Sequence, residues 1–343
     1  MGGLKVLTWH VHSAYLDSLA ATGHELFVPV APDGSGAIPP TAGWGDAVRE
    51  VPEAEVRELD NDVVVYQAAR NWTEDQHRIL SERQLRGPRV YVEHDPPRQS
   101  PTDTRHPVDD PEVLLVHVTA FNALMWDSGQ TPVRVIEHGV RVPDGLRWRG
   151  DVARGIVVVN ELRKRGRRLG ADLVEHARRT LPLDVAGMRS DEDWGGLGDL
   201  SRPELHARMA EYRFFFHPAR YTSFGMAVCE AMTIGQPVVA LATTEMPTVI
   251  EDGRNGFTST DPARLEDAMR ELVDDRGLAM RIGTAGRETA LERFSIDRFA
   301  RDWTRVLEEA IGMSRPLHAG VAVAVPGEGV DQESPEMPAA VGR

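Results

Sequence analysis

The chain has 343 residues, of which 41% are hydrophobic and 27% charged, a composition typical of globular proteins at a length that favours two domains. Its formal net charge of −14 argues against general binding to nucleic acid or to an anionic membrane, because either requires a basic face. Since there is one cysteine and no apolar run long enough to span a bilayer, we expect a cytoplasmic protein with no intrachain disulfide and no transmembrane segment.

Short apolar runs alternate with helical patterns through the first half of the chain, which is typical of a parallel sheet flanked by helices. Leu16, Leu19 and Ala20 form the apolar stripe of a helix between the first two runs, and Gly23 is placed to end that helix. We expect strands at residues 4–8, 25–30, 62–67, 89–93, 113–119 and 134–137.

A polar segment at residues 143–150 contains proline and glycine and precedes a new apolar run. We therefore place the domain boundary there, with a first domain at residues 1–143 and a second at residues 144–312. The second domain repeats the alternation of strands and helices. Its expected strands are residues 155–160, 183–187, 213–217, 237–242 and 256–258.

The last predicted helix covers residues 295–312, with Ser295 as its cap and Gly312 placed to end it. Apolar residues recur along it at helical spacing, so one of its faces should be buried. Beyond it, residues 313–343 are rich in glycine, proline, alanine and glutamate without periodicity, and we expect a disordered tail.

The segment between His94 and Glu112 is polar, rich in proline and longer than most connections within a compact domain. Loops of this length are usually functional or disordered. The strand that precedes it ends in His94, at the carboxyl edge where sheets of this kind place their ligands. A lone histidine is often structural, so this position alone leaves both interpretations open.

The most informative segment is residues 214–240, which predict a buried strand, a polar loop, a helix that begins near Gly225, a stop at Gly235 and a second buried strand. Free backbone N–H groups at such a helix start suit a diphosphate. Glu230 lies in the second turn, close enough to accept hydrogen bonds from a sugar hydroxyl. An isolated glutamate is normally exposed, but this one interrupts the apolar run 226–234, which favours a binding role.

This segment resembles the donor-site signature of the retaining glycosyltransferases of family 4, the bacterial group 1 glycosyl transferases, which have the GT-B fold. In them an acidic residue, Gly-Phe-Gly-Leu, three apolar residues and Glu-Ala-Met precede a Gly-x-Pro-Val-Val-Ala strand. The resemblance continues in residues 251–257, like the family's Asp-Gly-x-x-Gly turn, and in residues 293–295; it covers the C-terminal half well and the N-terminal half weakly. The matching signature residues are Phe224, Gly225, Glu230, Ala231, Met232, Gly235, Pro237, Val238, Val239 and Ala240.

The resemblance implies two Rossmann-like parallel-sheet domains that face each other across a cleft, with the C-terminal helix returning to the first domain. It also implies that Glu230 binds the ribose hydroxyls of a nucleotide. The backbone N–H groups of Phe224, Gly225 and Met226, which follow Ser223, would then face the diphosphate and the transferred sugar.

Two positions depart from the family pattern. The family's first acidic residue, eight positions before Glu230, is Thr222 in this chain, and the family's Gly-Gly-x-Pro-Glu is replaced by residues 244–248. Since the first acid normally contacts the sugar, the donor sugar is not identified. We keep Thr222, Thr244 and Glu245 as candidate contacts for the sugar or the acceptor.

Residues 157–168 resemble the family's Gly-Arg-Leu, spacer and Lys-Gly element, which clamps the donor diphosphate, although Asn160-Glu161 replaces Gly-Arg. Cations fill five of the six positions 163–168. Arginine suits bidentate contact with phosphate, so we expect Arg163 and Arg165 to bind the donor. For any single residue a solvated basic helix start is an equally good reading, but a cationic first turn opposes the helix dipole, which favours function.

Three histidines of the first half are further candidates. The family often carries a histidine beside the donor sugar where His94 ends its strand, so His94 is the candidate catalytic residue. His10 and His12 replace the family's glycine-rich acceptor-side loop, and they could line the acceptor pocket or form a metal pair. Because GT-B enzymes generally need no metal, we expect no metal and no other cofactor.

These observations predict transfer of a sugar from a nucleotide-diphosphate donor to an acceptor hydroxyl, with retention implied by the resemblance; a glycan, a lipid-linked molecule or a small molecule would serve as acceptor. A nucleotide-sugar 2-epimerase of the same fold would need the donor site and no acceptor pocket. The missing acid at Thr222 leaves open a non-catalytic nucleotide-sugar-binding protein. A nicotinamide dehydrogenase is the weakest alternative, because no Gly-x-Gly-x-x-Gly follows the first strand.

Overall fold

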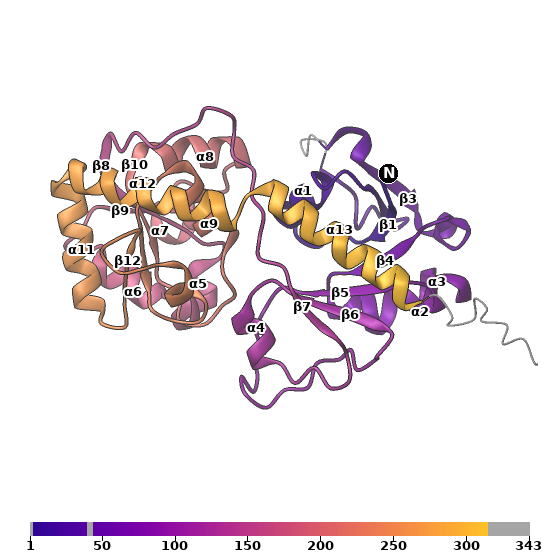
Figure 1. Cartoon of the computed structure of the whole chain (residues 1–343). Helices are drawn as coiled ribbons and strands as arrows, with labels where there is room; N and C mark the ends of the chain where they lie inside the picture. The colour runs from indigo at the N-terminus through magenta and orange to yellow at the C-terminus, as the bar shows by residue number, and fades with distance from the viewer. Residues whose placement is uncertain (1–2, 40–43, 315–343) are drawn as a thin grey trace, which may run out of the picture.

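The computed structural model describes residues 3–39 and 44–314, which form two lobes between which the chain crosses twice (Figure 1). Each lobe contains one sheet, and every strand pair in both sheets is parallel. The first sheet has seven strands in the order β3-β2-β1-β4-β5-β6-β7, and the second has five in the order β12-β11-β10-β8-β9. The two parallel-sheet domains expected from the sequence are thus confirmed.

The elements of the first domain are strands β1 (Lys5–Thr8), β2 (Glu25–Val30), β3 (Val48–Pro52), β4 (Val63–Tyr66), β5 (Arg89–Glu93), β6 (Val113–His117) and β7 (Val133–Val135), helices α1 (Ser13–Ala20), α2 (Gln76–Ile79), α3 (Glu82–Arg86) and α4 (Ala120–Met125), the 3-10 turns η1 (Gly45–Ala47) and η2 (Glu53–Glu58), and the π-helical turn η3 (Asn71–Asp75).

The elements of the second domain are strands β8 (Val152–Val158), β9 (Leu183–Ala186), β10 (Tyr212–His217), β11 (Val238–Leu241) and β12 (Phe257–Ser259), the 3-10 turn η4 (Gly166–Leu169), and helices α5 (Leu162–Arg165), α6 (Ala171–Ala177), α7 (Ser190–Trp194), α8 (Arg202–Glu211), α9 (Met226–Ile234), α10 (Met246–Val249), α11 (Pro262–Asp274) and α12 (Arg276–Arg293). The last helix among the described residues, α13 (Ile296–Met313), follows α12 directly.

The central strands of the first sheet are continuous apolar runs because side chains cover both of their faces. All residues of β4 and of β6 are buried. On one face the sheet packs against α1 and α13, and on the other against a cluster that includes Ile79 and Leu80. The loops at the carboxyl ends of these strands are therefore attached to a sheet that is packed on both faces.

The strand at residues 48–52 was not predicted from the sequence. It lies at the edge of the sheet next to β2, and its burial alternates only weakly, since Arg49, Glu50 and Pro52 are exposed. A charged edge strand of this kind lacks the apolar run by which the other strands are found, and the charges discourage pairing with another chain.

Close backbone packing fixes α9 in the second domain. A Cβ atom added to Gly283 of α12 would lie 2.0 Å from the carbonyl oxygen of Gly235, the residue that ends α9, and Gly235 itself has a φ of +93°. Both positions therefore need glycine. The result is a firmly seated α9, whose first turn reaches the junction between the domains.

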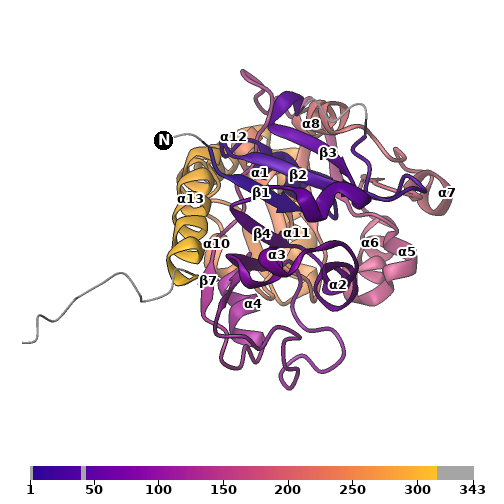
Figure 2. The same ribbon diagram turned by 90° about the vertical axis from the view of Figure 1, so that its right-hand side faces the viewer.

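The helix α13 leaves the second lobe and lies along the first sheet (Figures 1 and 2). Phe299, Trp303 and Leu307 belong to the same buried cluster as the residues of β1, β4 and β5. The prediction that Gly312 ends this helix was wrong, because α13 continues through Met313 and Ser314 takes the C-cap position. Of the predicted tail, residues 315–343 lie outside the described residues, and the position of the domain boundary stays a prediction.

Candidate functional site

The loop after β10 leads into α9 and presents unused hydrogen-bond donors. Within the residues that the structure describes, the backbone N–H groups of Phe224, Gly225 and Met226 have no acceptor. Gly225 is the N-cap residue in extended conformation, and both Gly225 and Met226 are partly exposed. Three free donors at the positive end of a nine-residue helix form an anion-binding geometry.

Glu230, one turn further along α9, is buried and ion-paired. Its Oε1 accepts hydrogen bonds from Nε of Arg202 at 3.1 Å and from Nη2 of Arg202 at 2.7 Å, and Nε2 of His206 lies 3.4 Å from the same oxygen. Burial acts to raise the pKa of Glu230, but His206 and Arg202 outweigh it and hold that pKa below its usual value. The carboxylate is therefore charged, although its side chain is only 5% exposed.

The first domain contacts the loop before α9 at several points. Nδ2 of Asn122 donates to Oγ of Ser223 at 3.1 Å, and the hydroxyl of Tyr221 donates to the carbonyl oxygen of Pro97 at 2.9 Å. The Nε2 atom of His138 lies 2.9 Å from the carbonyl oxygen of Phe224. The carboxyl ends of the two sheets consequently meet at this loop.

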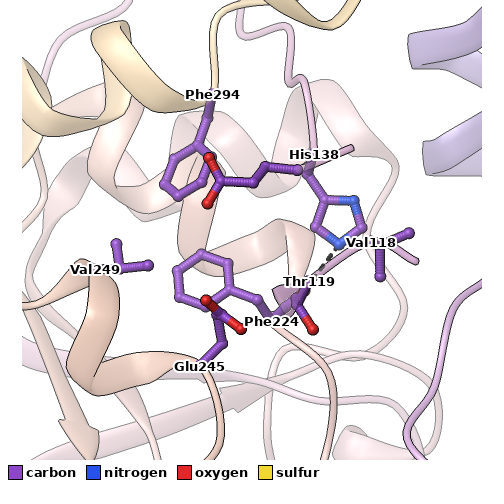
Figure 3. A pocket seen from close by; sticks show the side chains of 8 residues that line it. Val118, Thr119, His138, Phe224, Glu245, Val249 and Phe294 are labelled. Atoms are coloured by element: carbon purple, nitrogen blue, oxygen red, sulfur yellow. Dashed lines mark hydrogen bonds between the residues drawn. The ribbon is translucent and has the colours of Figure 1, made fainter. Parts of the chain in front are cut away.

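His138, Phe224 and Glu245 line the narrow space between the domains that Figure 3 shows. Burial lowers the pKa of His138 to about 4, so the ring is neutral and donates to the carbonyl of Phe224. This histidine thus contacts the loop before α9 directly. The ring of Phe294 packs against that of Phe224, with centroids 5.3 Å apart and the ring planes inclined by 30°.

Glu245 is also buried, but both of its oxygens are bonded. Oε2 accepts a hydrogen bond from the backbone N–H of Phe121, at the start of α4, at 2.8 Å, and Oε1 accepts from the hydroxyl of Thr248 at 2.7 Å. In this arrangement Glu245 joins the two domains, and each of its oxygens already accepts a hydrogen bond from the protein. Its neighbour Thr244 has a φ of +53°, a left-handed conformation that is unusual for threonine, at the position where the family pattern has glycine.

His12 and His94 lie together at the edge of the first sheet. Their ring centroids are 4.7 Å apart, and the ring of Tyr15 contacts His94 at 4.6 Å. Burial, followed by the charges of His12 and His138, lowers the pKa of His94 well below its usual value, and Nε2 of His94 has no hydrogen-bond partner among the described residues. His94 is thus a neutral ring with an unused nitrogen.

His10 lies in different surroundings from His12. Its Nδ1 is 2.9 Å from the carbonyl oxygen of Ala37, and its Nε2 is 2.9 Å from Oγ of Ser13. His10 lines a cavity of about 550 Å³ at the carboxyl ends of β1, β2 and β4, together with Trp9, Asn71 and Arg78. Across the described ranges, residues 3–39 and 44–314, no three histidine, cysteine or acidic side chains gather in a way that could hold a metal.

The basic segment after β8 divides into paired and unpaired cations. Arg163 donates to the carbonyl oxygen of Asp193 at 2.8 Å and lies over the ring of Trp194, and Lys164 pairs with Glu161. Arg165 is exposed, and its side chain makes no hydrogen bond or ion pair with any residue that the structure describes. The structure therefore separates the two predicted clamp residues, leaving Arg165 free and Arg163 engaged.

Arg165 belongs to a cluster of cations that spans the two domains. Arg168 donates to the carbonyl oxygen of Tyr221 at 3.2 Å, and burial followed by the charge of Arg98 lowers the pKa of Arg168. Arg98 comes from the long loop after His94, and it also pairs with Asp95 at 2.5 Å. The predicted functional loop thus contributes a cation that sequence reasoning had not singled out.

Thr222 lies between Tyr221 and Ser223, half-buried, and its hydroxyl has no hydrogen bond with the residues described. The structure thus brings Thr222, Ser223, Phe224, Gly225 and Met226 to the interdomain junction. None of the helices in the described part of the chain is long and apolar enough to cross a membrane.

Comparison with known proteins gives one family match. Residues 196–289 match the model of the family described as "Glycosyl transferases group 1". A segment of 113 residues is 33% identical to alpha-maltose-1-phosphate synthase of Mycolicibacterium smegmatis, and it spans 31% of this chain and 27% of that protein. The chain thus aligns with about a quarter of the length of this relative.

Solved structures resemble nearly the whole chain. Sucrose-phosphate synthase from Thermosynechococcus elongatus superposes with a TM-score of 0.65 at 14% identity, covering 90% of this chain and 99% of that one. HepE of Anabaena, solved in complex with UDP, superposes with a TM-score of 0.64 at 15% identity, covering 90% of this chain and 100% of that one. At these identities the likeness establishes the fold. Residues 196–289 are thus similar to the group 1 glycosyl transferases, and the chain has the GT-B fold of two Rossmann-like domains.

Proposed function

We propose that this chain is a glycosyltransferase that moves a sugar from a nucleotide-diphosphate donor to the hydroxyl of an acceptor, with retention of configuration. The observation that carries the proposal is the combination on α9 of three free N–H donors, at Phe224, Gly225 and Met226, with a charged and buried Glu230. The first group suits a diphosphate and the second suits ribose hydroxyls. The family match over residues 196–289 supports the same assignment.

The cations at the junction would stabilise the leaving diphosphate. In the proposed step the bond between the anomeric carbon and the diphosphate oxygen breaks, and the acceptor oxygen bonds to the same face of that carbon. The leaving phosphate takes the acceptor proton. Arg165 and the free amides would stabilise the negative charge that develops, and Arg163 would support them from the side of Trp194.

His94 would contact the transferred sugar. Its ring is neutral and its Nε2 has no partner among the described residues, but that atom is sealed from solvent. Contact with a sugar hydroxyl would therefore require the surrounding loop to move, and it would bring no charge next to the cationic cluster. His12, packed against His94, is the second candidate on this side. Thr222 and Thr244 would contact the sugar from the second domain, whereas Glu245 would first have to release Phe121 or Thr248.

The cavity that His10 lines is the candidate acceptor pocket. Its volume of about 550 Å³ is within the range of small-molecule sites, and it combines Trp9 with polar side chains such as Asn71 and Arg78. The acceptor class and the expected cytoplasmic location stay predictions. Because position 222 is a threonine and carries no carboxylate, a second candidate function is binding of a nucleotide sugar without transfer.

A thermal-shift screen of the whole chain with nucleoside diphosphates and their sugars tests the proposal, because a ligand that binds only the native state raises the unfolding temperature. We expect at least one nucleoside diphosphate to raise it in a concentration-dependent way. A screen in which none does so contradicts the proposal. Transfer of a labelled sugar from the donor so identified then separates catalysis from binding alone.

A further inference from the structure

Arg202 is in an electrostatically unfavourable position that two carboxylates offset. It is the first residue of α8, after the N-cap Ser201, whose side chain forms a capping box with Glu204. A cation at this end of a helix opposes the helix dipole. Arg202 is nevertheless held in place, between Glu230 of its own domain and Asp17 of the first domain.

The guanidinium group uses three donors on these two partners. Nε and Nη2 donate to Oε1 of Glu230 at 3.1 and 2.7 Å, and Nη1 donates to Oδ2 of Asp17 at 2.8 Å. The other oxygen of Asp17 accepts from Nε1 of Trp44 at 2.9 Å. Because the guanidinium is planar and rigid, it fixes the position of Glu230 relative to α1.

Only one oxygen of Glu230 is used in this way. Both bonds from Arg202 and the close approach of His206 involve Oε1. Oε2 makes no hydrogen bond with any described residue, and it is not among the polar atoms sealed from solvent. The carboxylate thus has one anchored oxygen and one that a ligand can reach.

We propose that Arg202 is a positioning residue for the donor nucleotide: it holds Glu230 charged with Oε2 free for the ribose, and through Asp17 it makes nucleotide affinity depend on the contact between the domains. This inference rests on the proposed function, because that function assigns Glu230 to the ribose. Arg202 itself does not contact the nucleotide. It acts on binding through the carboxylate that it orients.

The pH dependence of binding should report this role. The groups that face Glu230 are Arg202 and His206 from α8, Asp17 through Arg202, and His138, whose pKa responds to the charge of Glu230. On the side of α12, Arg287 donates to the carbonyl of Thr233. Without Arg202 only His206 opposes the effect of burial, so the pKa of Glu230 should rise and the carboxylate should lose its ligand at a higher pH than in the unaltered chain.

The experiment measures the affinities of uridine and guanosine diphosphate by calorimetry between pH 5.5 and 8. It compares the unaltered chain with Arg202→Gln, Arg202→Lys, Asp17→Asn and the control Arg208→Gln, which removes an exposed arginine of the same helix that pairs with Glu211. We expect about tenfold weaker binding for Arg202→Gln at pH 7.5, a larger loss on acidification, and partial recovery in Arg202→Lys. Asp17→Asn should weaken binding about threefold, and the control should leave it unchanged.

Arg202→Gln with the affinity and pH profile of the unaltered chain would overturn the positioning role. An unchanged affinity in Asp17→Asn would overturn the dependence on the domain contact, and this variant keeps the test decisive if Arg202→Gln does not fold. These results are distinct from failure of the proposed function. In that case the unaltered chain itself binds neither nucleotide.

Discussion

Two buried glutamates of the second domain reach the first domain by different chemistry. Glu230 does so through a charged intermediary, Arg202, and keeps one oxygen free. Glu245 accepts a hydrogen bond directly from the backbone N–H of Phe121, and its other oxygen accepts one from the hydroxyl of Thr248. A carboxylate whose oxygens are all bonded within the protein stabilises the contact between the domains, whereas one with a free oxygen and a compensating cation is prepared for a ligand.

The largest expected effect comes from Glu230→Gln. The amide keeps the shape of the side chain and loses the charge that strengthens hydrogen bonds to ribose hydroxyls, so affinity for a nucleoside diphosphate should fall by roughly 10- to 100-fold. Calorimetry measures this, with thermal unfolding as a check that the variant folds. Unchanged affinity would remove Glu230 from the donor site.

Lowering the pH should reduce stability through the buried neutral histidines and leave the charge of Glu230 in place. Burial lowers the pKa of His117 from 6.5 to about 3. Above pH 6.5 the ring is neutral in the folded and in the unfolded chain. Below pH 6.5 the unfolded chain takes up a proton that the folded chain does not. The contribution of His117 alone should therefore lower the free energy of unfolding by about 2 kcal/mol between pH 7 and pH 5. Since the pKa of Glu230 is lowered, its charge should persist over the same range.

His117→Leu tests the histidine part of this contrast, because leucine removes the titrating ring from a fully buried position. Urea denaturation at pH 7 and pH 5 should show about 2 kcal/mol less acid destabilisation in the variant. Parallel losses in both proteins would place the acid sensitivity elsewhere.

The smallest effect should come from Glu245→Gln. It weakens one of the bonds between the domains and should lower the free energy of unfolding by about 1 kcal/mol, while nucleotide affinity stays within about twofold. Denaturation and calorimetry of the same preparation give both values. A loss of affinity as large as in Glu230→Gln would make the two glutamates functionally equivalent.

The sequence predicted the parts of the site that are local along the chain. The strand, loop and helix around Gly225 occupy one continuous segment with a clear pattern of apolar and small residues. The partners that complete this segment are distant in sequence: Arg202 is 28 positions from Glu230, His138 is 86 from Phe224, and Asn122 is 101 from Ser223. No single-sequence pattern connects such pairs, because only tertiary packing brings them together, within the second domain for Arg202 and between the domains for the other two.

Two other differences have physical causes. Glycine destabilises the interior of a helix, but Gly312 lies in the last turn of α13, where extending the helix by one residue costs little free energy. The side chains of His10 and His12, which the sequence suggested as a pair, lie apart. His10 hydrogen-bonds Ala37 and Ser13, whereas His12 packs on His94. Neighbours in an irregular loop need not share a site.

The crossing of α13 has a consequence for biosynthesis. Trp303, which is fully buried, and its apolar neighbours on α13 complete a core whose other buried members lie between Val6 and Ile136. On the ribosome, one apolar face of the first sheet is therefore covered by α1 alone, and stays partly exposed until α13 has emerged. Chaperone dependence during translation, and sensitivity to truncation near residue 300, would follow from this single helix.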